Sequence, residues 1–410
     1  MEKKRIYIVD EYKEKFTGVL TANYLDNRPP MVETVENGII LPAKKQIDKD
    51  GTPYFLGGVA DSDGRYIPAS QNWRGAKGGS LTGGYEITPG KEKSCAATVV
   101  FAGILQNHFG HFLMESTSRL WFWLEHQDMD IAYIMGKKAK IIGRFWEFIA
   151  LLGIPPERVH IINEPIRFKK VYIPSSSHIF EHSYTEAFIR PYQYAAEKVE
   201  PGKDEKIYLS RTKFSKGTVC YGECEIEKVF NANGFKSVYP EKLSLREQIA
   251  AIKGAKEIAG VIGTATHLEV FARPGVKSII LERSDMPIAE QAIVHQAIKA
   301  DWYSVGANMN PFPIDHSDGP VLLGITEEVC DFCRDMGLKV EKGRVGYIAK
   351  RHCRKFIKDY MRRNTQLSYN QALALQEPLL ARRLLRMAGA FVPWRKKIKQ
   401  KWKAWRLSGQ

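Results

Sequence analysis

The amino-acid sequence predicts an α/β protein whose second half forms a parallel, doubly wound sheet. The first observation is that strand-like and helix-like segments alternate strictly between residues 206 and 282. The second is the length of 410 residues, for which two domains are the natural expectation. The third is a hydrophobic content of 44%, which is ample for real cores. In sheets of this kind, ligands bind beyond the carboxyl ends of the strands.

The elements of the second half follow from their patterns in order. Four strands are expected, at residues 206–211, 236–239, 257–263 and 276–282. Three helices are expected between them, at residues 225–233, 244–254 and 266–272. Ser244 and Glu247 have the spacing of a capping box, and Gly234 is placed to end the first of the three helices. Arg211, Gly263-Thr264 and Glu282 fall at strand ends, while glycine-rich dinucleotide and P-loop signatures are missing.

The first half is rich in glycine and turns, and its strands are short. Strands are expected at residues 6–9, 38–41, 97–102, 132–135, 159–162 and 170–174. A helix at residues 144–152 is ended by Gly153. Asp61-Ser62-Asp63 sits in a glycine-flanked turn and is not expected to bind a metal.

The most informative segment runs from Asn107 to Trp121 and is expected to be one helix with Asn107 as its N-cap. At about 100° per residue, its polar side chains fall within an arc of roughly 100°. They are His108, His111, Glu115, Ser118 and Arg119. The rest of the circumference is apolar, so the helix should be buried. Burying unpaired polar groups is costly, so the polar stripe predicts the wall of a cleft. A buried polar pair that only ties this helix to a loop is the alternative.

Charge is concentrated at the C-terminal end. Residues 346–410 hold 17 Lys and Arg against Asp359 and Glu377, which accounts for the whole net charge of +15. Residues 351–363 and 379–387 are expected to form basic amphipathic helices. Residues 393–407 interleave tryptophans with lysines, a pattern suited to a lipid headgroup layer. The tail therefore predicts an anionic membrane surface as a partner.

The remaining composition favours a cytoplasmic location, peripheral on the inner face of the membrane. The N-terminal residues do not resemble a signal peptide, and no stretch approaches the ~20 apolar residues of a membrane span. Six cysteines are sparse, so reduced thiols are expected. Cys220-x-x-x-Cys224 and Cys330-x-x-Cys333 are too isolated to indicate a zinc site.

Three segments, taken in order, resemble the family 61 glycosyltransferases. They are the Gly-His-Phe-Leu-x-Glu…Arg-Leu-Trp motif at residues 110–121, the Tyr-Leu-Ser-Arg strand at 208–211, and the Gly-Thr-Ala-Thr-His-Leu-Glu-Val-Phe-Ala-Arg-Pro-Gly segment at 263–275. The resemblance covers roughly residues 95–285 and is most specific in its first part. Many family members have Asn where this chain has Glu269.

The resemblance implies a GT-B architecture, in which two Rossmann-like domains face each other across a cleft. The expected divisions are an acceptor-side domain at 1–190, a nucleotide-sugar-binding domain at 191–345 and a membrane-associating tail at 346–410. The implied activity is inverting, metal-independent transfer from a nucleotide-sugar, taken to be a UDP-sugar, in surface or capsular polysaccharide synthesis. A glycan, expected to be lipid-linked, is the acceptor. The donor is a substrate, and no cofactor is expected.

Inverting transfer needs a base for the acceptor hydroxyl and positive charge for the leaving diphosphate. His111 is the first candidate for the base, oriented by Glu115, and Glu115 with a pKa raised by burial is the alternative. Arg119 is expected to pair with Glu115 or to bind substrate. The expected donor contacts include the candidate diphosphate clamp Arg211 and the candidate ribose ligand Glu282. The further donor-side candidates are Lys213, Lys216, Gly263, Thr264 and His267.

Two other classes of function fit parts of the same pattern. His108, His111 and Glu115 have a spacing that could ligate one ion, as in a metal-dependent hydrolase. The basic tail could instead serve a non-catalytic protein that binds nucleic acid or a membrane. The glycosyltransferase hypothesis is the leading one, and under it nucleic acid is not an expected partner.

Overall fold

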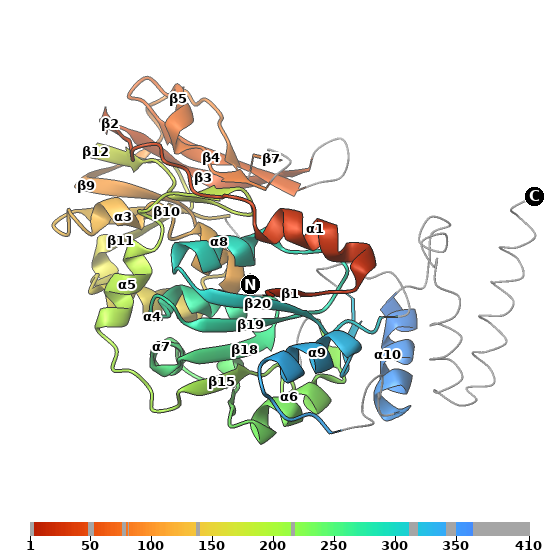
Figure 1. The fold of residues 1–410 in the computed structure, drawn as a ribbon. Helices are drawn as coiled ribbons and strands as arrows, with labels where there is room; N and C mark the ends of the chain where they lie inside the picture. Colours follow the sequence, from red (N-terminus) through yellow and green to blue (C-terminus); the bar gives the residue numbers. More distant parts are fainter. Residues whose placement is uncertain are drawn as a thin grey trace, which may run out of the picture.

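The computed structural model shows two large β-sheets with a layer of helices between them (Figure 1). It describes residues 4–47, 53–75, 79–80, 82–136, 140–214, 218–310, 319–341 and 350–363. Lys216 and the predicted amphipathic segments at 379–387 and 393–407 lie outside these residues. The α/β class predicted from the sequence is confirmed.

Six strands form a parallel sheet from the second half of the chain and the N-terminus. In spatial order they are β17 (Lys236–Val238), β15 (Lys206–Leu209), β18 (Glu257–Val261), β19 (Lys277–Glu282), β20 (Asp301–Gly306) and β1 (Ile6–Tyr7). All neighbouring pairs are parallel. The chain leaves β15 toward β17 and then returns past it to β18, so the direction of winding reverses between β15 and β18. This reversal is the switch point at which doubly wound sheets bind ligands.

Helices cover both faces of the parallel sheet. On one face lie α6 (Glu223–Ala232) and α9 (Glu327–Asp335). On the other face lie α7 (Leu245–Gly254), the 3-10 helix η4 (Thr266–Phe271) and α8 (Ala289–Ala297). Ser244 and Glu247 form the predicted capping box at the start of α7. The segment at 266–271 is a 3-10 helix where an α-helix was predicted.

The N-terminal segment belongs to this sheet and not to the first half of the fold. β1 pairs with the edge strand β20, and α1 (Asp10–Leu20) packs against α8 through Phe16, Leu20 and Ala292. The predicted boundary at residue 190 therefore does not divide the chain cleanly. β1 has only two residues, so its sequence pattern is too short to show which sheet it joins.

The second sheet is mixed. Four parallel strands form one side, in the order β11 (Val159–Ile162), β10 (Asp130–Ile134), β9 (Lys93–Ile104) and β12 (Ile166–Pro174). Antiparallel strands extend this sheet beyond β12. β2 (Val32–Glu36) and β3 (Ile39–Ile47) both pair with β12, β4 (Pro53–Ala60) pairs with β3, and β5 (Tyr66–Ile67) pairs with β4. The short strand β8 (Thr82–Gly83) is parallel to β4. Rossmann-like connections are thus confined to the four parallel strands. The expectation that the first half is a Rossmann-like domain therefore holds for these strands and not for the antiparallel ones.

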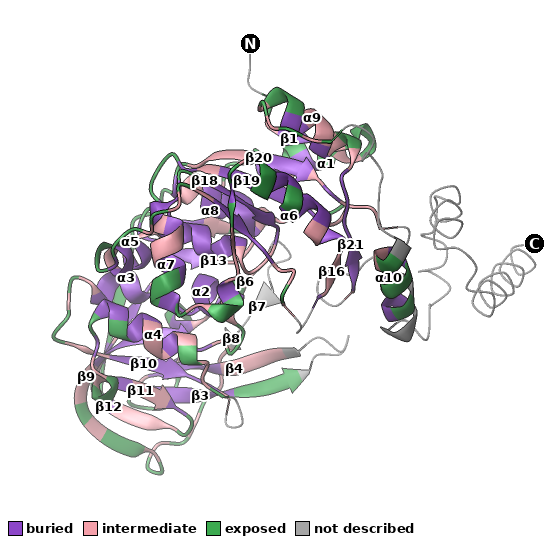
Figure 2. Cartoon of the chain, turned by 90° about the horizontal axis from the view of Figure 1, so that it is seen from below, coloured by how far each residue is buried: buried purple, intermediate pink, exposed green. Residues whose placement is uncertain are grey.

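The layer between the sheets is one continuous hydrophobic core, drawn mostly as buried in Figure 2. It contains α2 (Phe109–Glu115), α3 (Leu120–Trp123), α4 (Gly143–Leu152) and α5 (Arg190–Glu197) together with α7, η4 and α8. The ring of Phe148 lies 5.8 Å from that of Phe112 and 6.4 Å from that of Phe271, between centroids. The two halves are therefore packed together through these helices, and the cleft expected between them stays a prediction.

The predicted single helix at 107–121 is broken. α2 begins after His108, which makes no side-chain cap, and it ends at Glu115. The side chains of Ser116 and Thr117 donate hydrogen bonds to backbone carbonyls, at 2.9 Å to Ile104 and 2.9 Å to Leu113. Such local bonds compete with helix continuation. The chain resumes helix only at α3, so the polar arc does not persist beyond Glu115.

The helix predicted at 351–363 is confirmed as α10 (Lys350–Arg363). Its buried residues Cys353, Phe356 and Tyr360 face β16 (Cys220–Tyr221) and β21 (Val321–Leu322). The first part of the predicted tail is therefore attached to the body of the protein. Within the described residues, none of the helices has the length and apolar character needed to cross a membrane.

Candidate active site

His111 and Glu115 form a close pair on α2, one helical turn apart. Nδ1 of His111 lies 2.8 Å from Oε2 of Glu115. The Glu115 side chain is 4% exposed, whereas that of His111 is 34% exposed. The imidazole therefore stands between a buried carboxylate and solvent, beside the rings of His108 and Phe180 at 5.2 Å each.

Arg74 completes this pair. It lies on β6 (Trp73–Arg74), and its guanidinium donates to both carboxylate oxygens of Glu115, at 2.7 Å and 2.6 Å. Bidentate pairing of this kind fixes the carboxylate plane as well as its charge. Arg74 comes from the glycine-rich N-terminal region, where no sequence pattern singled it out.

The charge state of Glu115 follows from these contacts. Burial favours a raised pKa, but the contacts from His111 and Arg74 outweigh it and lower the pKa of Glu115 below its ordinary value. Glu115 is thus an ionised carboxylate that lies against Nδ1 of His111, so Nε2 is the ring nitrogen that faces away from it. This contradicts the raised pKa on which Glu115 depended as the alternative base.

Arg119 has a different place from the one predicted. It is 1% exposed, and its guanidinium donates to backbone carbonyls of Pro174, Ala69 and Gln71. It does not pair with Glu115, because the turn after α2 rotates it away from the polar arc. In this structure Arg119 joins η1 (Pro68–Ser70) to the end of β12.

The donor-side candidates gather at the switch point of the parallel sheet. Arg211 follows β15, Gly263 follows β18, and Arg283 follows β19. A methyl group placed on Gly263, whose φ is +143°, would lie 3.4 Å from a guanidinium nitrogen of Arg283 and 3.9 Å from one of Arg211. Two guanidinium groups therefore flank this turn. Arg283 was missed from the sequence, although it follows Glu282 at a strand end.

Two hydrogen bonds fix the position of Arg211. Its backbone amide donates to Oε1 of Glu223 at 2.8 Å, and its guanidinium donates to the carbonyl of Thr218 at 3.2 Å. Its Nε is buried and has no hydrogen-bond partner among the described residues. A half-buried guanidinium whose buried Nε has unused donor capacity is suited to an anionic ligand. Lys213 instead places its amine over the ring of Tyr239, 3.9 Å from the centroid.

α2 touches the Gly263 turn directly. A methyl group on Gly110 would lie 2.9 Å from Oγ1 of Thr264, so only glycine allows this approach. The charge of Arg211 also reaches His108: burial, with the nearby charges of His111 and Arg211, lowers the pKa of His108. The structure thus brings the predicted pair on α2 together with Arg211, Gly263 and Thr264.

A buried polar network supports the turn. Oγ1 of Thr266 donates to the carbonyl of Gly263 and contacts Oε1 of Gln291, both at 2.8 Å. Gln291 in turn donates to Glu269 at 3.2 Å, and Ser278 donates to the same carboxylate at 2.9 Å. Glu269, the departure from the family pattern, is therefore fully partnered inside the fold.

His267 and Glu282 are both enclosed. His267 is 7% exposed, and burial lowers its pKa to about 4. Glu282 is 1% exposed and accepts a hydrogen bond from Ser304 at 2.7 Å, while burial raises its pKa to about 7. In this conformation neither side chain offers a solvent-facing surface, so the predicted ribose contact of Glu282 stays a prediction.

A second carboxylate near the pair was missed. Glu181 lies between β13 (His178–Ile179) and β14 (Ser183–Tyr184) with φ of +56°, a left-handed conformation. Its amide donates to Glu290 at 2.9 Å, and Glu290 also lies 3.0 Å from His178. Burial, together with Glu290, raises the pKa of Glu181. A non-glycine residue in this conformation is uncommon, and Asn37 and Lys299 share it with Glu181.

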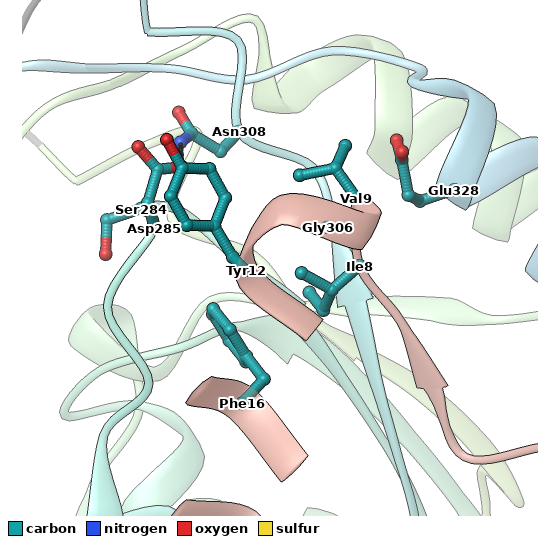
Figure 3. Close-up of a pocket in the computed structure, with 9 residues that line it drawn as sticks. All are labelled: Ile8, Val9, Tyr12, Phe16, Ser284, Asp285, Gly306, Asn308 and Glu328. Atoms are coloured by element: carbon teal, nitrogen blue, oxygen red, sulfur yellow. Dashed lines mark hydrogen bonds between the residues drawn. The ribbon is translucent and has the colours of Figure 1, made fainter. Parts of the chain in front are cut away.

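A small cavity lies elsewhere at the carboxyl edge of the sheet (Figure 3). Its volume is about 40 Å³. It is lined by Ile8, Val9, Tyr12, Phe16, Ser284, Asp285, Gly306, Asn308 and Glu328. That space is the size of a water molecule. The candidate site is instead at α2 and the Gly263 turn, where the predicted residues meet.

Taken together, the fold and the site define an α/β enzyme that presents a histidine and an arginine-flanked turn at one sheet edge. The family model described as Glycosyltransferase 61 matches residues 109–281, from the start of α2 into β19. This match identifies residues 109–281 as similar to the Glycosyltransferase 61 family and indicates that the protein is a glycosyltransferase. The resemblance predicted from the sequence is thereby confirmed. A search of curated proteins finds no match to the chain.

Proposed function

We propose that the protein is an inverting glycosyltransferase that moves a sugar from a nucleotide-sugar to a glycan acceptor. The observation that carries this proposal is the contact between α2 and the Gly263 turn. Support comes from the close approach of Gly110, on the helix of the His111–Glu115 pair, to Thr264, in the turn that Arg211 and Arg283 flank. One site then holds a proton acceptor and a cationic cradle, which are the two components that glycosyl transfer requires.

On the donor side, the two guanidinium groups bind the diphosphate and stabilise the charge that develops on it as the leaving group. Arginine geometry suits phosphate oxygens, and a pair of arginines supplies the charge that other enzymes take from a divalent cation. This supports transfer without a metal at this site. The donor proposed is a UDP-sugar, with the parallel sheet as the donor half and the mixed sheet as the acceptor half of a GT-B enzyme.

On the acceptor side, Nε2 of His111 takes the proton of the acceptor hydroxyl. The oxygen forms a bond to the anomeric carbon on the face opposite the diphosphate. The bond from that carbon to the diphosphate oxygen breaks, and its electron pair leaves with the diphosphate. Glu115, ionised and held by Arg74, stabilises the imidazolium that results.

The setting proposed is synthesis of a surface or capsular polysaccharide on a lipid-linked acceptor, at the inner face of the membrane. Support comes from the sequence of residues 364–410, which hold ten Lys and Arg against Glu377. Tryptophans interleaved with these charges suit an anionic headgroup layer.

The rival metal-dependent hydrolase is not favoured. In the described part of the chain, the ligand atoms of His108, His111 and Glu115 do not gather around one point. Both oxygens of Glu115 are engaged by Arg74, and Nδ1 of His111 faces Glu115. Transfer that persists in excess EDTA is the expected result for the proposed enzyme.

A thermal-shift panel of nucleotide-sugars tests the proposed function. The donor should raise the melting temperature by mass action, because it binds the folded state alone. Arg211→Ala and Arg283→Ala should each abolish that shift, and Arg65→Ala, at a side chain 73% exposed, is the matched control. A panel without any response, or a shift that survives both arginine substitutions, would overturn the proposed donor site. A response to another nucleotide would replace UDP as the donor.

A further inference from the structure

Three potential metal ligands converge away from the transfer site, where α6 meets α10. Cys224 and Glu225 lie in the first turn of α6, and His352 lies in the first turn of α10. Sγ of Cys224 is 3.4 Å from Nε2 of His352 and 3.9 Å from Oε1 of Glu225. The distance from Nε2 of His352 to Oε1 of Glu225 is 4.0 Å.

These separations are close to those of a metal-bound set. Ligands about 2.0–2.3 Å from a tetrahedral zinc ion are about 3.3–3.6 Å from one another. The three distances exceed that range by at most a few tenths of an ångström, which side-chain rotation can remove. Glu225 is buried, and the other two residues are half-buried, so the cluster is sheltered but reachable.

The protonation pattern at His352 also fits a ligand. Nε of Arg351 donates toward Nε2 of His352 at 3.3 Å, so this nitrogen presents its lone pair. A metal requires that same lone pair. The charged groups facing the cluster are Lys228, Arg351, Lys355 and Glu227. Lys228, which contacts Glu225 at 3.2 Å, is 61% exposed and can turn into solvent when a cation binds.

We propose that Cys224, Glu225 and His352 bind a zinc ion that fastens α10 to α6. Sulfur, imidazole and carboxylate ligands together suit Zn²⁺ better than Mg²⁺ or Ca²⁺, which prefer oxygen alone. Three protein ligands leave the fourth position to water. The Cys224 thiol releases its proton when the metal binds, so the bond formed is a zinc–thiolate bond.

The proposed role of this ion is structural. α10 already packs on β16 and β21 through buried residues, and the cluster lies in its first turn. An ion at this point would hold the segment from which residues 364–410 continue. It takes no part in the proposed transfer, which remains metal-independent at α2.

The experiment uses the full chain, stripped with EDTA and then reconstituted with zinc chloride. Bound metal is counted by elemental analysis after removal of free ion. We expect one equivalent per chain for the wild type and a loss to background for Cys224→Ser and His352→Asn. The double variant Cys330→Ser/Cys333→Ser controls for other thiols, and His111→Ala controls for the imidazole of the transfer site. Both controls should keep their zinc.

Cobalt gives a readout that does not depend on the variants folding. Co²⁺ added to the stripped wild type should produce a thiolate-to-metal charge-transfer band in the near ultraviolet, and zinc should bleach it. Absence of that band, absence of stoichiometric zinc in the wild type, or zinc retained by Cys224→Ser would each overturn the site. Loss of zinc from His111→Ala with retention in His352→Asn would move the ion to α2 and likewise overturn it.

Discussion

At the scale of single residues, the site depends on how buried charges are partnered. Glu115 is nearly inaccessible, yet contacts from Arg74 and His111 keep its pKa below the ordinary value. Glu282 is equally buried but has a single hydroxyl donor, from Ser304, and its pKa rises to about 7. Burial alone therefore does not decide the charge of a carboxyl group in this protein; its partners do.

Glu282→Gln should change how stability depends on pH. The folded protein holds a proton on Glu282 up to about pH 7, whereas the unfolded chain releases it near pH 4.5. Stability from this group is therefore present at low pH and is lost as pH rises from about 4.5 to 7. Glutamine does not titrate, so the free energy of unfolding of the variant, relative to that of the wild type, should be greater at pH 8 than at pH 5. The gain is at most about 3 kcal/mol.

Denaturant melts at the two pH values measure this difference. Comparing the variant with the wild type at each pH cancels the titration of other groups. Glu157→Gln, at an exposed position, is the control and should show the same difference at both pH values. An equal difference for Glu282→Gln would contradict the raised pKa.

At the scale of elements, the decisive contact is that of α2 with the Gly263 turn. It depends on Gly110, where a methyl group would meet Oγ1 of Thr264 at 2.9 Å and Cγ2 at 3.2 Å. The glycine of the Gly-His-Phe motif is thus explained by close approach, and the histidine beside it is carried into the site. We expect a side chain at position 110 to lower the activity, because α2 and the Gly263 turn both border the proposed donor site.

Gly110→Ala should lower kcat/KM at least about tenfold, because α2 must retreat from the turn, and tenfold corresponds to about 1.4 kcal/mol. Adding Thr264→Ala removes the clashing atoms and should restore the packing of α2, seen as recovered donor affinity. Gly18→Ala, in α1 with no atom within 4 Å of the new methyl group, is the control. It should keep activity and gain about 0.5–1 kcal/mol of stability. Unchanged kcat/KM in Gly110→Ala would argue against the contact.

The elements of the second half could be predicted because local signals and the β/α alternation agree there. The capping box at Ser244 and the apolar run of β18 both appear where expected. The interruption of the helix expected at 107–121 could not be predicted. It depends on hydrogen bonds from the side chains of Ser116 and Thr117 to carbonyls of earlier residues. Periodicity records which residues are apolar but not which hydroxyl bonds the backbone.

At the scale of the whole molecule, the two sheets share one core through the helices between them. Sequence patterns suggested separate halves because each half has its own strands, and no local pattern records which helix faces meet. The same holds for the site. Arg211 and Gly263 were found as strand ends, but Arg74 and Glu181 reach the site through tertiary contacts alone.

Removal of residues 364–410 should abolish sedimentation with anionic lipid vesicles and leave the body folded. The cut follows Arg363 because α10 is packed on the body, so a cut at residue 346 would expose its contact surface. Binding of the full chain should weaken as salt rises, as expected for basic residues near an anionic surface. Truncated protein that still sediments with the vesicles would refute the membrane role of the tail.

The central claim is that His111 and the arginine-flanked turn form one site with separate tasks. The most direct measurement compares transfer and donor binding in His111→Ala. The account predicts a loss of about 10²- to 10⁴-fold in transfer, as for removal of a general base, with the donor affinity unchanged. Transfer close to that of the wild type, or an equal loss of donor affinity, would contradict it.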